Sequence, residues 1–132
     1  MSQPILIVED HQGVRQSLRE WLELSFPRCQ LLEAASGEEA VAMVQTMSPS
    51  LVIMDIGLPG MTGIEAAQEI KAAAPATRVV MLTIYDDAAH RTDAIAAGVS
   101  AYVPKRKVQT ELLPVLTRLL AEGRQEPPSR LT

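Results

Sequence analysis

The sequence lacks several features that would place it in other protein classes. It has one cysteine, Cys29, among 132 residues, so an internal disulfide is excluded, which fits a reducing compartment. Its net charge of −4 argues against a general nucleic-acid-binding surface in this segment. Its longest apolar runs fall far short of the about 20 residues of a membrane helix, and no signal peptide is recognisable. We therefore expect a cytoplasmic protein that does not enter the membrane.

The composition that remains is that of one globular domain. Hydrophobic residues make up 47% of the chain and charged residues 21%, a balance typical of folded rather than disordered proteins. A chain of this length can enclose a single core. The residues after Gly123 are polar and proline-rich, as in a linker. We predict a domain over 1–123 and a linker or tail over 124–132 that leads toward a C-terminal segment missing from this sequence.

Short apolar runs alternate with segments of helical periodicity. Capping boxes at Ser36/Glu39 and Thr62/Glu65, and the terminator Gly98, indicate helix ends. Strands are expected over 4–8, 29–34, 51–54, 79–82 and 101–103, and helices over 13–25, 36–47, 62–74, 87–98 and 108–122. This alternation predicts an α/β fold with a parallel sheet that helices cover on both faces.

Four of the expected strands end at polar residues of types that carry chemistry. These residues are Glu9 and Asp10, Asp55, Thr83, and Lys105. Because the carboxyl ends of parallel strands meet at one edge of an open sheet, we expect these side chains to lie close together. Three neighbouring carboxylates repel one another without a cation, and Mg²⁺ prefers oxygen ligands. An Asp can also act as a nucleophile that forms an aspartyl-phosphate, with Mg²⁺ and a Lys neutralising the phosphoryl charge.

The sequence resembles the receiver domain of bacterial two-component response regulators. The matching stretches are 5–11, 55–63, 82–87 and 97–105, and with the order of the elements they cover residues 4–122. The stretch 82–87 is most similar to the NarL/LuxR branch, in which a linker joins the receiver to a helix-turn-helix DNA-binding domain. The resemblance implies a doubly wound, five-stranded parallel sheet in the flavodoxin-like order 2-1-3-4-5, with five helices in three α/β/α layers.

The resemblance also implies the residues of a phosphorylation site. Asp55 would accept a phosphoryl group from a sensor histidine kinase. Glu9 and Asp10 would bind Mg²⁺, or Mn²⁺ in its place, together with Asp55 and the backbone carbonyl of Gly57. Such a domain would promote its own phosphorylation and dephosphorylation, but it would not be a turnover enzyme.

A second group of residues would convert the added charge into a change of shape. The resemblance implies that Thr83 and Lys105 bind the phosphoryl group and that Tyr102 turns inward as Thr83 moves. The change would reach the face made by the fourth helix, fifth strand and fifth helix. The implied partners are the kinase, the C-terminal output domain of the full-length protein and a second copy in a homodimer. DNA would be reached only through the output domain.

Some positions depart from the common receiver pattern. Many receivers have a proline directly after the lysine, across a cis bond, whereas here Pro104 precedes Lys105 and Arg106 follows it. Ile84 is bulkier than the residue often found beside the threonine, and Gly57 offers no side chain near the phosphoryl group. The geometry of the loop and the rate of dephosphorylation therefore stay open.

Two other functions known for proteins of this fold class require residues that this sequence lacks. An FMN-binding protein of this fold would need a Gly-rich or Ser/Thr-rich phosphate loop after the first strand, where Glu9 and Asp10 would repel a phosphate. An aspartate-nucleophile phosphatase would carry a second acid two residues after Asp55, where Gly57 stands. A stand-alone receiver, or a pseudo-receiver that acts by protein–protein interaction without phosphorylation, remains an alternative.

The last predicted helix has a wide apolar surface. One stripe is formed by Leu112, Val115, Leu116 and Leu119, and Leu113 and Leu120 fall to its side. If these two leucines are exposed, they favour a surface for dimerisation or for docking of an output domain. The alternative is that the helix packs on both the sheet and the first helix.

Overall fold

The computed structural model describes residues 4–125, and the side chains of residues 4–122. One parallel sheet has the strand order β2-β1-β3-β4-β5, which is the order that the resemblance to receiver domains implied. In the sheet, Ile5 pairs with Leu31 on one side and with Leu51 on the other. The strands are β1 (Ile5–Val8), β2 (Leu31–Ala34), β3 (Leu51–Met54), β4 (Arg78–Thr83) and β5 (Ala101–Pro104).

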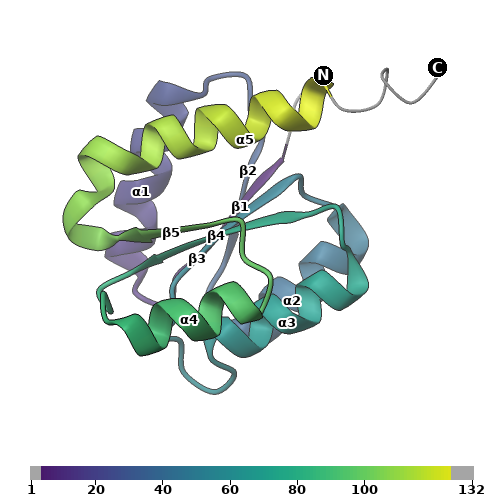
Figure 1. Cartoon of the computed structure of the whole chain (residues 1–132). Helices are drawn as coiled ribbons and strands as arrows, with labels where there is room; N and C mark the ends of the chain where they lie inside the picture. Colours follow the sequence, from purple (N-terminus) through teal and green to yellow (C-terminus); the bar gives the residue numbers. More distant parts are fainter. Residues whose placement is uncertain (1–3, 126–132) are drawn as a thin grey trace.

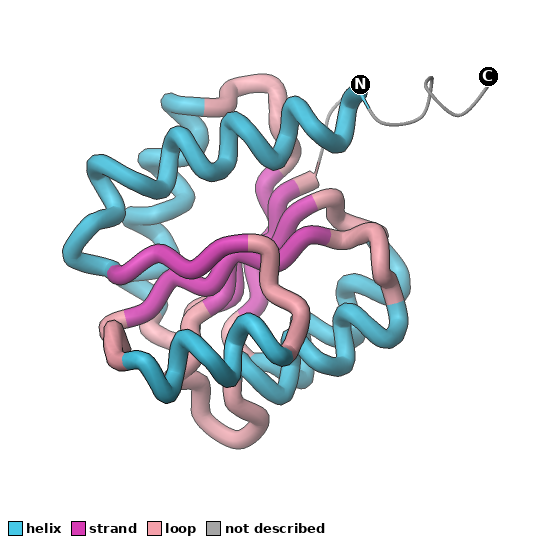
Figure 2. Tube along the Cα trace, viewed as in Figure 1, coloured by secondary structure: helices cyan, strands magenta, loops and turns pink. Residues whose placement is uncertain are grey.

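Five α-helices cover the two faces of this sheet, as predicted. The α1 and α5 helices lie on one face, and α2, α3 and α4 lie on the other (Figure 1; Figure 2 shows the sheet between the two helical layers). Within residues 4–125, none of the helices combines the length and apolar character needed to cross a bilayer. The helices are α1 (Gln12–Ser25), α2 (Gly37–Met47), α3 (Gly63–Ala73), α4 (Ala88–Ala96) and α5 (Leu113–Gln125).

The continuous apolar runs arise because each strand is buried on both faces. Alternate residues of β1 point to opposite sides: Ile5 and Ile7 pack with α1 and α5, whereas Leu6 and Val8 pack with α2, α3 and α4. All four are buried. Burial of each such side chain contributes about 1.5–3 kcal/mol to folding, so the two half-cores hold the strands in register.

The capping boxes form to different extents. Thr62 and Glu65 make the complete motif at the start of α3: the Glu65 N–H donates to Thr62 Oγ1 at 3.2 Å and the Thr62 N–H donates to Glu65 Oε1 at 2.9 Å. At α2 the prediction was half right. Ser36 accepts from the Glu39 N–H at 3.1 Å, but the Glu39 carboxylate accepts from the N–H of Ala35, at 2.7 Å, instead of that of Ser36.

The segment before α5 is not the regular helix predicted from residue 108. A 3₁₀ turn, Lys105–Lys107, is followed by a π-helical turn, Val108–Leu112, before α5 begins. Pro114 gives the reason: it has no N–H for the carbonyl of Thr110, and its ring crowds that carbonyl. A wider turn relieves the crowding. The α5 helix then continues through Gln125, three residues past the predicted end at residue 122, and the rest of the predicted tail lies outside the described residues.

The expectation of an exposed pair of leucines on the last helix was wrong for Leu120. Leu120 is buried in the core with Leu116 and Leu119, because the three residues follow the i, i+3, i+4 spacing of one helical face. Leu113 is exposed at its edge. Packing of α5 on the sheet and α1 therefore accounts for most of its apolar surface.

Candidate functional site

Three of the predicted strand-end residues meet through one ammonium group. Lys105, directly after β5, places Nζ 3.0 Å from Glu9 Oε1 and 3.3 Å from Asp55 Oδ2. Glu9 follows β1 and Asp55 follows β3, so the neighbouring strand ends bring the groups together. The side chains of Glu9 and Asp55 are only 7% and 13% exposed, so their charges are poorly screened by water and the contacts with Lys105 compensate them.

The electrostatic setting of Lys105 favours its charged form. Partial burial opposes the charge, but the hydrogen bond to Glu9 and the negative charge of Asp55 outweigh that effect, and the pKa of Lys105 lies above its usual 10.5. Lys105 is therefore cationic at neutral pH and lies in contact with both carboxylates.

The carboxylate of Asp55 is oriented from its own loop. Its Oδ1 accepts from the N–H of Gly57 at 3.3 Å. A side chain at position 57 would meet the ring of Tyr85, because an added Cβ would lie 3.4 Å from Tyr85 Cε2. The aromatic ring of Tyr85 therefore lies against the loop beside Asp55, a contact that could not be anticipated from the sequence.

Thr83 and Tyr102 are joined through the backbone of Tyr85. Thr83 Oγ1 accepts from the Tyr85 N–H at 3.2 Å, and the Tyr102 hydroxyl donates to the Tyr85 carbonyl. Thr83 is fully buried and Tyr102 is nearly so. The two residues that the resemblance implied as a switch therefore share a single loop residue, and Tyr102 is turned inward in this structure.

The guanidinium of Arg91, on α4, lies over the ring of Tyr102. The guanidinium carbon of Arg91 lies 4.5 Å from the centre of the Tyr102 ring. Burial raises the pKa of the Tyr102 hydroxyl above its usual value, with Arg91 opposing and Asp86 and Asp87 reinforcing the shift. The hydroxyl is therefore a neutral hydrogen-bond donor at neutral pH.

The 3₁₀ turn Lys105–Lys107 is anchored to the β4–α4 loop by Asp86, an acid to which the sequence analysis assigned no role. Asp86 accepts from Arg91 at 3.1 Å and from Arg106 at 2.5 Å, and the hydrogen bonds from Arg106 and then Arg91 lower its pKa. Arg106, interpreted from the sequence as a departure from the receiver pattern, thus ties the residue after Lys105 to α4. Within residues 4–125 no peptide bond is cis, so the Lys105–Arg106 bond is trans.

The remaining predicted metal ligands are arranged more openly. Asp10 follows Glu9 in the β1–α1 loop and is exposed. Across the described part of the chain, no three side chains of His, Cys, Asp or Glu lie together as a ready cation-binding group. The carboxylates that share a contact with Lys105 are those of Glu9 and Asp55.

Comparison with known proteins identifies the family to which this chain belongs. The model of the response regulator receiver domain matches residues 5–117. The chain is 33% identical over 117 residues to the transcriptional activator protein ExaE of Pseudomonas putida, covering 89% of this chain and 55% of that protein. It is 36% identical over 109 residues to the uncharacterized transcriptional regulatory protein YhcZ of Bacillus subtilis, covering 83% and 51%. The chain thus spans about half the length of these curated relatives.

Solved structures agree with the sequence comparisons. A two-component response regulator of the LuxR family from Aurantimonas sp. superposes with a TM-score of 0.85 at 34% identity, covering 92% of this chain and 86% of that one. A CheY-like response regulator receiver domain protein from Methanospirillum hungatei superposes with a TM-score of 0.87 at 27% identity, covering 96% and 99%. The chain belongs to the family of response regulator receiver domains, the regulatory domains of two-component systems.

Proposed function

We propose that this chain is a phospho-accepting receiver in which Asp55 takes a phosphoryl group from a histidine kinase in a Mg²⁺-dependent reaction. The observation that carries the proposal is the contact of Lys105 with both Glu9 and Asp55, at 3.0 and 3.3 Å. It places a cation beside a poorly exposed carboxylate at the sheet edge where ligands bind in this class of fold. A carboxylate nucleophile with a cationic partner is what phosphoryl transfer requires.

In the reaction, an Asp55 oxygen forms a bond to phosphorus while the bond from phosphorus to the donor histidine nitrogen breaks. The nitrogen leaves as a neutral imidazole after taking up a proton, and Asp55 becomes an acyl phosphate. Lys105 can follow the new phosphoryl oxygens because its ammonium already lies at Asp55. Thr83 would release the Tyr85 N–H to donate its hydroxyl to the phosphoryl group, and Tyr102 would hold the loop through the Tyr85 carbonyl.

The donor set fits Mg²⁺. This ion is bound by oxygen atoms, commonly one or two carboxylates together with waters and phosphate oxygens, and Asp55, Asp10 and the backbone carbonyl of Gly57 are all oxygen donors, with Glu9 assisting. When bound, the ion would neutralise charge on the phosphoryl group, and Mn²⁺ has the same ligand preference. A compact group of three side chains is not needed for such a site.

The wider role of the domain follows from its relatives. ExaE is described as a transcriptional activator, and the LuxR-family regulator from Aurantimonas shares the fold over most of its chain. We infer a cytoplasmic receiver over 1–123 that controls a DNA-binding output domain beyond a linker at 124–132, through the α4–β5–α5 face. The receiver can also pair with a second copy of itself, and it would contact DNA only through the output domain.

The test is the intact mass of the protein after incubation with acetyl phosphate, with and without Mg²⁺. The wild type and an Asp93→Asn control, which alters an exposed acid of α4, are expected to gain one phosphoryl group only when Mg²⁺ is present. The Asp55→Asn variant is expected to gain none. A gain that persists in Asp55→Asn would move the site elsewhere. No gain in the wild type, together with no spectral response to beryllofluoride, would favour a pseudo-receiver that acts through partner binding alone.

A further inference from the structure

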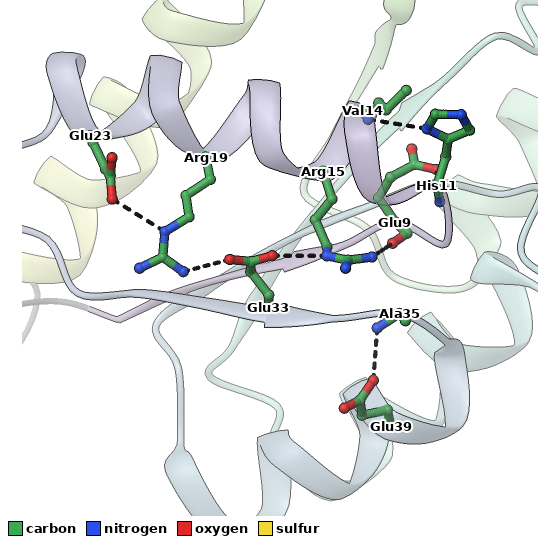
Figure 3. A network of polar contacts seen from close by, with 9 residues as sticks. All are labelled: Glu9, His11, Val14, Arg15, Arg19, Glu23, Glu33, Ala35 and Glu39. Atoms are coloured by element: carbon green, nitrogen blue, oxygen red, sulfur yellow. Dashed lines mark hydrogen bonds and ion pairs between the residues drawn. The ribbon is translucent and has the colours of Figure 1, made fainter.

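Arg15 joins the first helix to the loop that carries the acidic pair (Figure 3). Its Nε donates to Glu33 Oε1 at 2.8 Å, and its Nη1 donates to the backbone carbonyl of Glu9 at 2.7 Å. The Arg15 side chain is only 16% exposed, so both bonds are partly shielded from water and are stronger than at an open surface. Arg15 therefore holds one particular peptide group of the site.

That peptide group is the one between Glu9 and Asp10. A peptide is planar, so the orientation of the Glu9 carbonyl also fixes the orientation of the Asp10 N–H and the direction in which the Asp10 Cα follows. Rotation of this plane would swing the Asp10 side chain away from its present direction, because the plane and the Cα are rigidly connected. The hydrogen bond from Arg15 opposes that rotation.

The other polar atoms of Glu9 are held as well. Its N–H donates to the Ala34 carbonyl at 3.1 Å, its Oε1 accepts from Lys105 at 3.0 Å and its Oε2 accepts from the His11 N–H at 3.1 Å. These contacts fix the residue before the plane and the side chain of Glu9. The carbonyl is the remaining polar group of Glu9, and Arg15 supplies its partner.

Asp10, in contrast, is oriented by its backbone. Its side chain is exposed, and it makes no hydrogen bond or ion pair with any residue that the structure describes. The position of its carboxylate therefore depends on the peptide plane before it more than on contacts of its own.

Arg15 is itself held in place by Glu33, which projects from the otherwise apolar β2. The Glu33 carboxylate also accepts from Arg19 Nη1 at 2.6 Å, and Arg19 continues to Glu23 at 3.2 Å (Figure 3). Hydrogen bonds from Arg15, and then from Arg19, hold the pKa of Glu33 below its usual 4.5. The carboxylate is thus ionised at neutral pH and anchors the Arg15 guanidinium.

We propose that Arg15 is a positioning residue for the cation site: by holding the Glu9 carbonyl it orients the Asp10 carboxylate toward a divalent cation at Asp55. The inference rests on the proposed function. Arg15 does not touch the cation or the phosphoryl group, and Glu33 acts one step further away by fixing the guanidinium.

Arg19 offers a matched control. It lies one helical turn after Arg15 and shares the Glu33 carboxylate, but among the described residues its side chain contacts Glu23 and Glu33 and not Glu9. Arg15→Met and Arg19→Met each remove a guanidinium from the same network. Only the first variant frees the Glu9 carbonyl, so the comparison separates positioning from a general loss of charge.

The experiment is a Mg²⁺ titration followed by the fluorescence of Trp21, which lines the same cleft as Glu9 and Lys105. Loss of a supporting contact of this kind typically weakens metal binding by about 10-fold or more, and we expect a rise of about that size in the Kd of Arg15→Met. For Arg19→Met the Kd is expected to change less than about twofold, as for an exposed ion pair. Urea unfolding of both variants verifies that they are folded under the titration conditions.

A second measurement needs no metal. In metal-free protein, the ¹³C shift of the Glu9 carbonyl and the ¹⁵N shift of the Asp10 amide are expected to move in Arg15→Met and to stay in place in Arg19→Met. Arg15→Lys keeps the charge but lacks the fork that reaches both acceptors, so its Kd is expected to lie between those of the wild type and Arg15→Met.

The outcomes are distinguishable. An unchanged Kd in a folded Arg15→Met variant, beside a wild type that binds Mg²⁺, would overturn the positioning role and leave the proposed function intact. Equal weakening in Arg15→Met and Arg19→Met would also overturn it, because a general charge effect would then suffice. A wild type that does not respond to Mg²⁺ would overturn the proposed metal-dependent function and this role with it.

Discussion

Lys105 compensates two carboxylates at once, and this sets the energetic cost of removing it. We expect Lys105→Met to lower the free energy of unfolding by about 2 kcal/mol, the usual size for hydrogen bonds to charged groups. The reason is that the poorly exposed Glu9 would lose its counter-charge. Urea unfolding at neutral pH measures the loss. Lys107→Met is the control, since Lys107 pairs with Glu111 at 3.6 Å on an exposed surface and should cost less than about 1 kcal/mol. Equal losses would contradict the argument.

Glu33 gives a dependence on pH whose sign is fixed by its contacts. Its pKa is lowered from 4.5 by hydrogen bonds from Arg15 and Arg19, so its stabilising effect is present above pH 4.5 and disappears as the pH falls through the lower, folded-state pKa. We expect Glu33→Gln to cost about 1 kcal/mol at neutral pH, as for a partly exposed ion network, and progressively less below pH 4.5. Urea unfolding of wild type and variant in steps of pH tests this. A difference that grows in acid would contradict it.

The sequence predicted which residues lie together at the sheet edge better than it predicted the contacts that hold them there. Asp55, Thr83 and Lys105 could be assigned to one edge because each ends an apolar run, and parallel strands end on the same side. Arg15 and Tyr85 could not be found in this way. Their contacts depend on the rotamer that reaches a carbonyl and on the distance between a ring and a glycine. The spacing of apolar residues along the chain determines neither of these.

At the scale of elements, the start of α3 is built against the loop of Asp55. Gly63 is the first residue of α3, and its N–H donates to the Ile56 carbonyl at 2.9 Å. A Cβ at this position would stand 2.0 Å from the Asp55 carbonyl oxygen and 2.8 Å from Ile56 Cα. Both contacts are with backbone, so a side chain cannot be accommodated by a change of rotamer. The helix and the Asp55 loop would have to separate.

We therefore expect Gly63→Ala to destabilise the fold by about 3 kcal/mol or more, in the range of severe steric changes, and to reduce phosphorylation of Asp55 in whatever fraction remains folded. Thermal unfolding and the acetyl phosphate assay measure the two effects. Gly13→Ala in α1 is the control: its added Cβ would meet the movable His11 side chain at 3.2 Å, and the better helix propensity of Ala offsets that contact. A Gly63→Ala variant as stable as Gly13→Ala would refute the packing argument.

The elements themselves were largely predictable, and the exceptions have local causes. The five strands could be predicted because a strand buried on both faces is a continuous run of apolar residues. The five helices could be predicted from the helical spacing of their apolar residues and from their caps. The π-helical turn before α5 was not predicted, since the effect of Pro114 on the preceding carbonyl does not alter the apolar pattern. Leu120 was placed wrongly for a related reason: its spacing from Leu116 fits a buried face as well as an exposed one.

At the scale of the whole molecule, polar contacts connect the two helical layers through the sheet edge. Arg15 of α1 donates a hydrogen bond to the β1–α1 loop. Lys105 contacts both that loop, at Glu9, and the loop of Asp55. Arg106 pairs with Asp86, which lies in the loop before α4. A charge added at Asp55 would thus act on contacts that span both faces of the sheet. This supports a response of the domain as a unit rather than of one loop.

Metal binding should therefore appear in the stability of the entire fold. A ligand that binds only the folded state raises the unfolding free energy by RT ln(1 + [L]/Kd), about 2.7 kcal/mol when its concentration is 100 times the Kd. We expect Mg²⁺ to raise the thermal unfolding temperature as this gain in unfolding free energy increases with Mg²⁺ concentration, and we expect EDTA to reverse the rise. Asp10→Asn should lose most of this rise, because the variant lacks one of the proposed carboxylate ligands. Differential scanning calorimetry over a series of Mg²⁺ concentrations provides the measurement.

Screening of the net charge of −4 offers a competing explanation, since any salt weakens repulsion among surface carboxylates. NaCl at matched ionic strength separates the two effects: screening acts equally for both salts, whereas a specific site responds to Mg²⁺ at far lower concentration. The Asp93→Asn variant, with one exposed acid of α4 removed, has the same change of net charge as Asp10→Asn and should keep the Mg²⁺ response. If NaCl reproduces the stabilisation, or if both variants lose it alike, the cation acts on the surface as a whole and not at the strand ends.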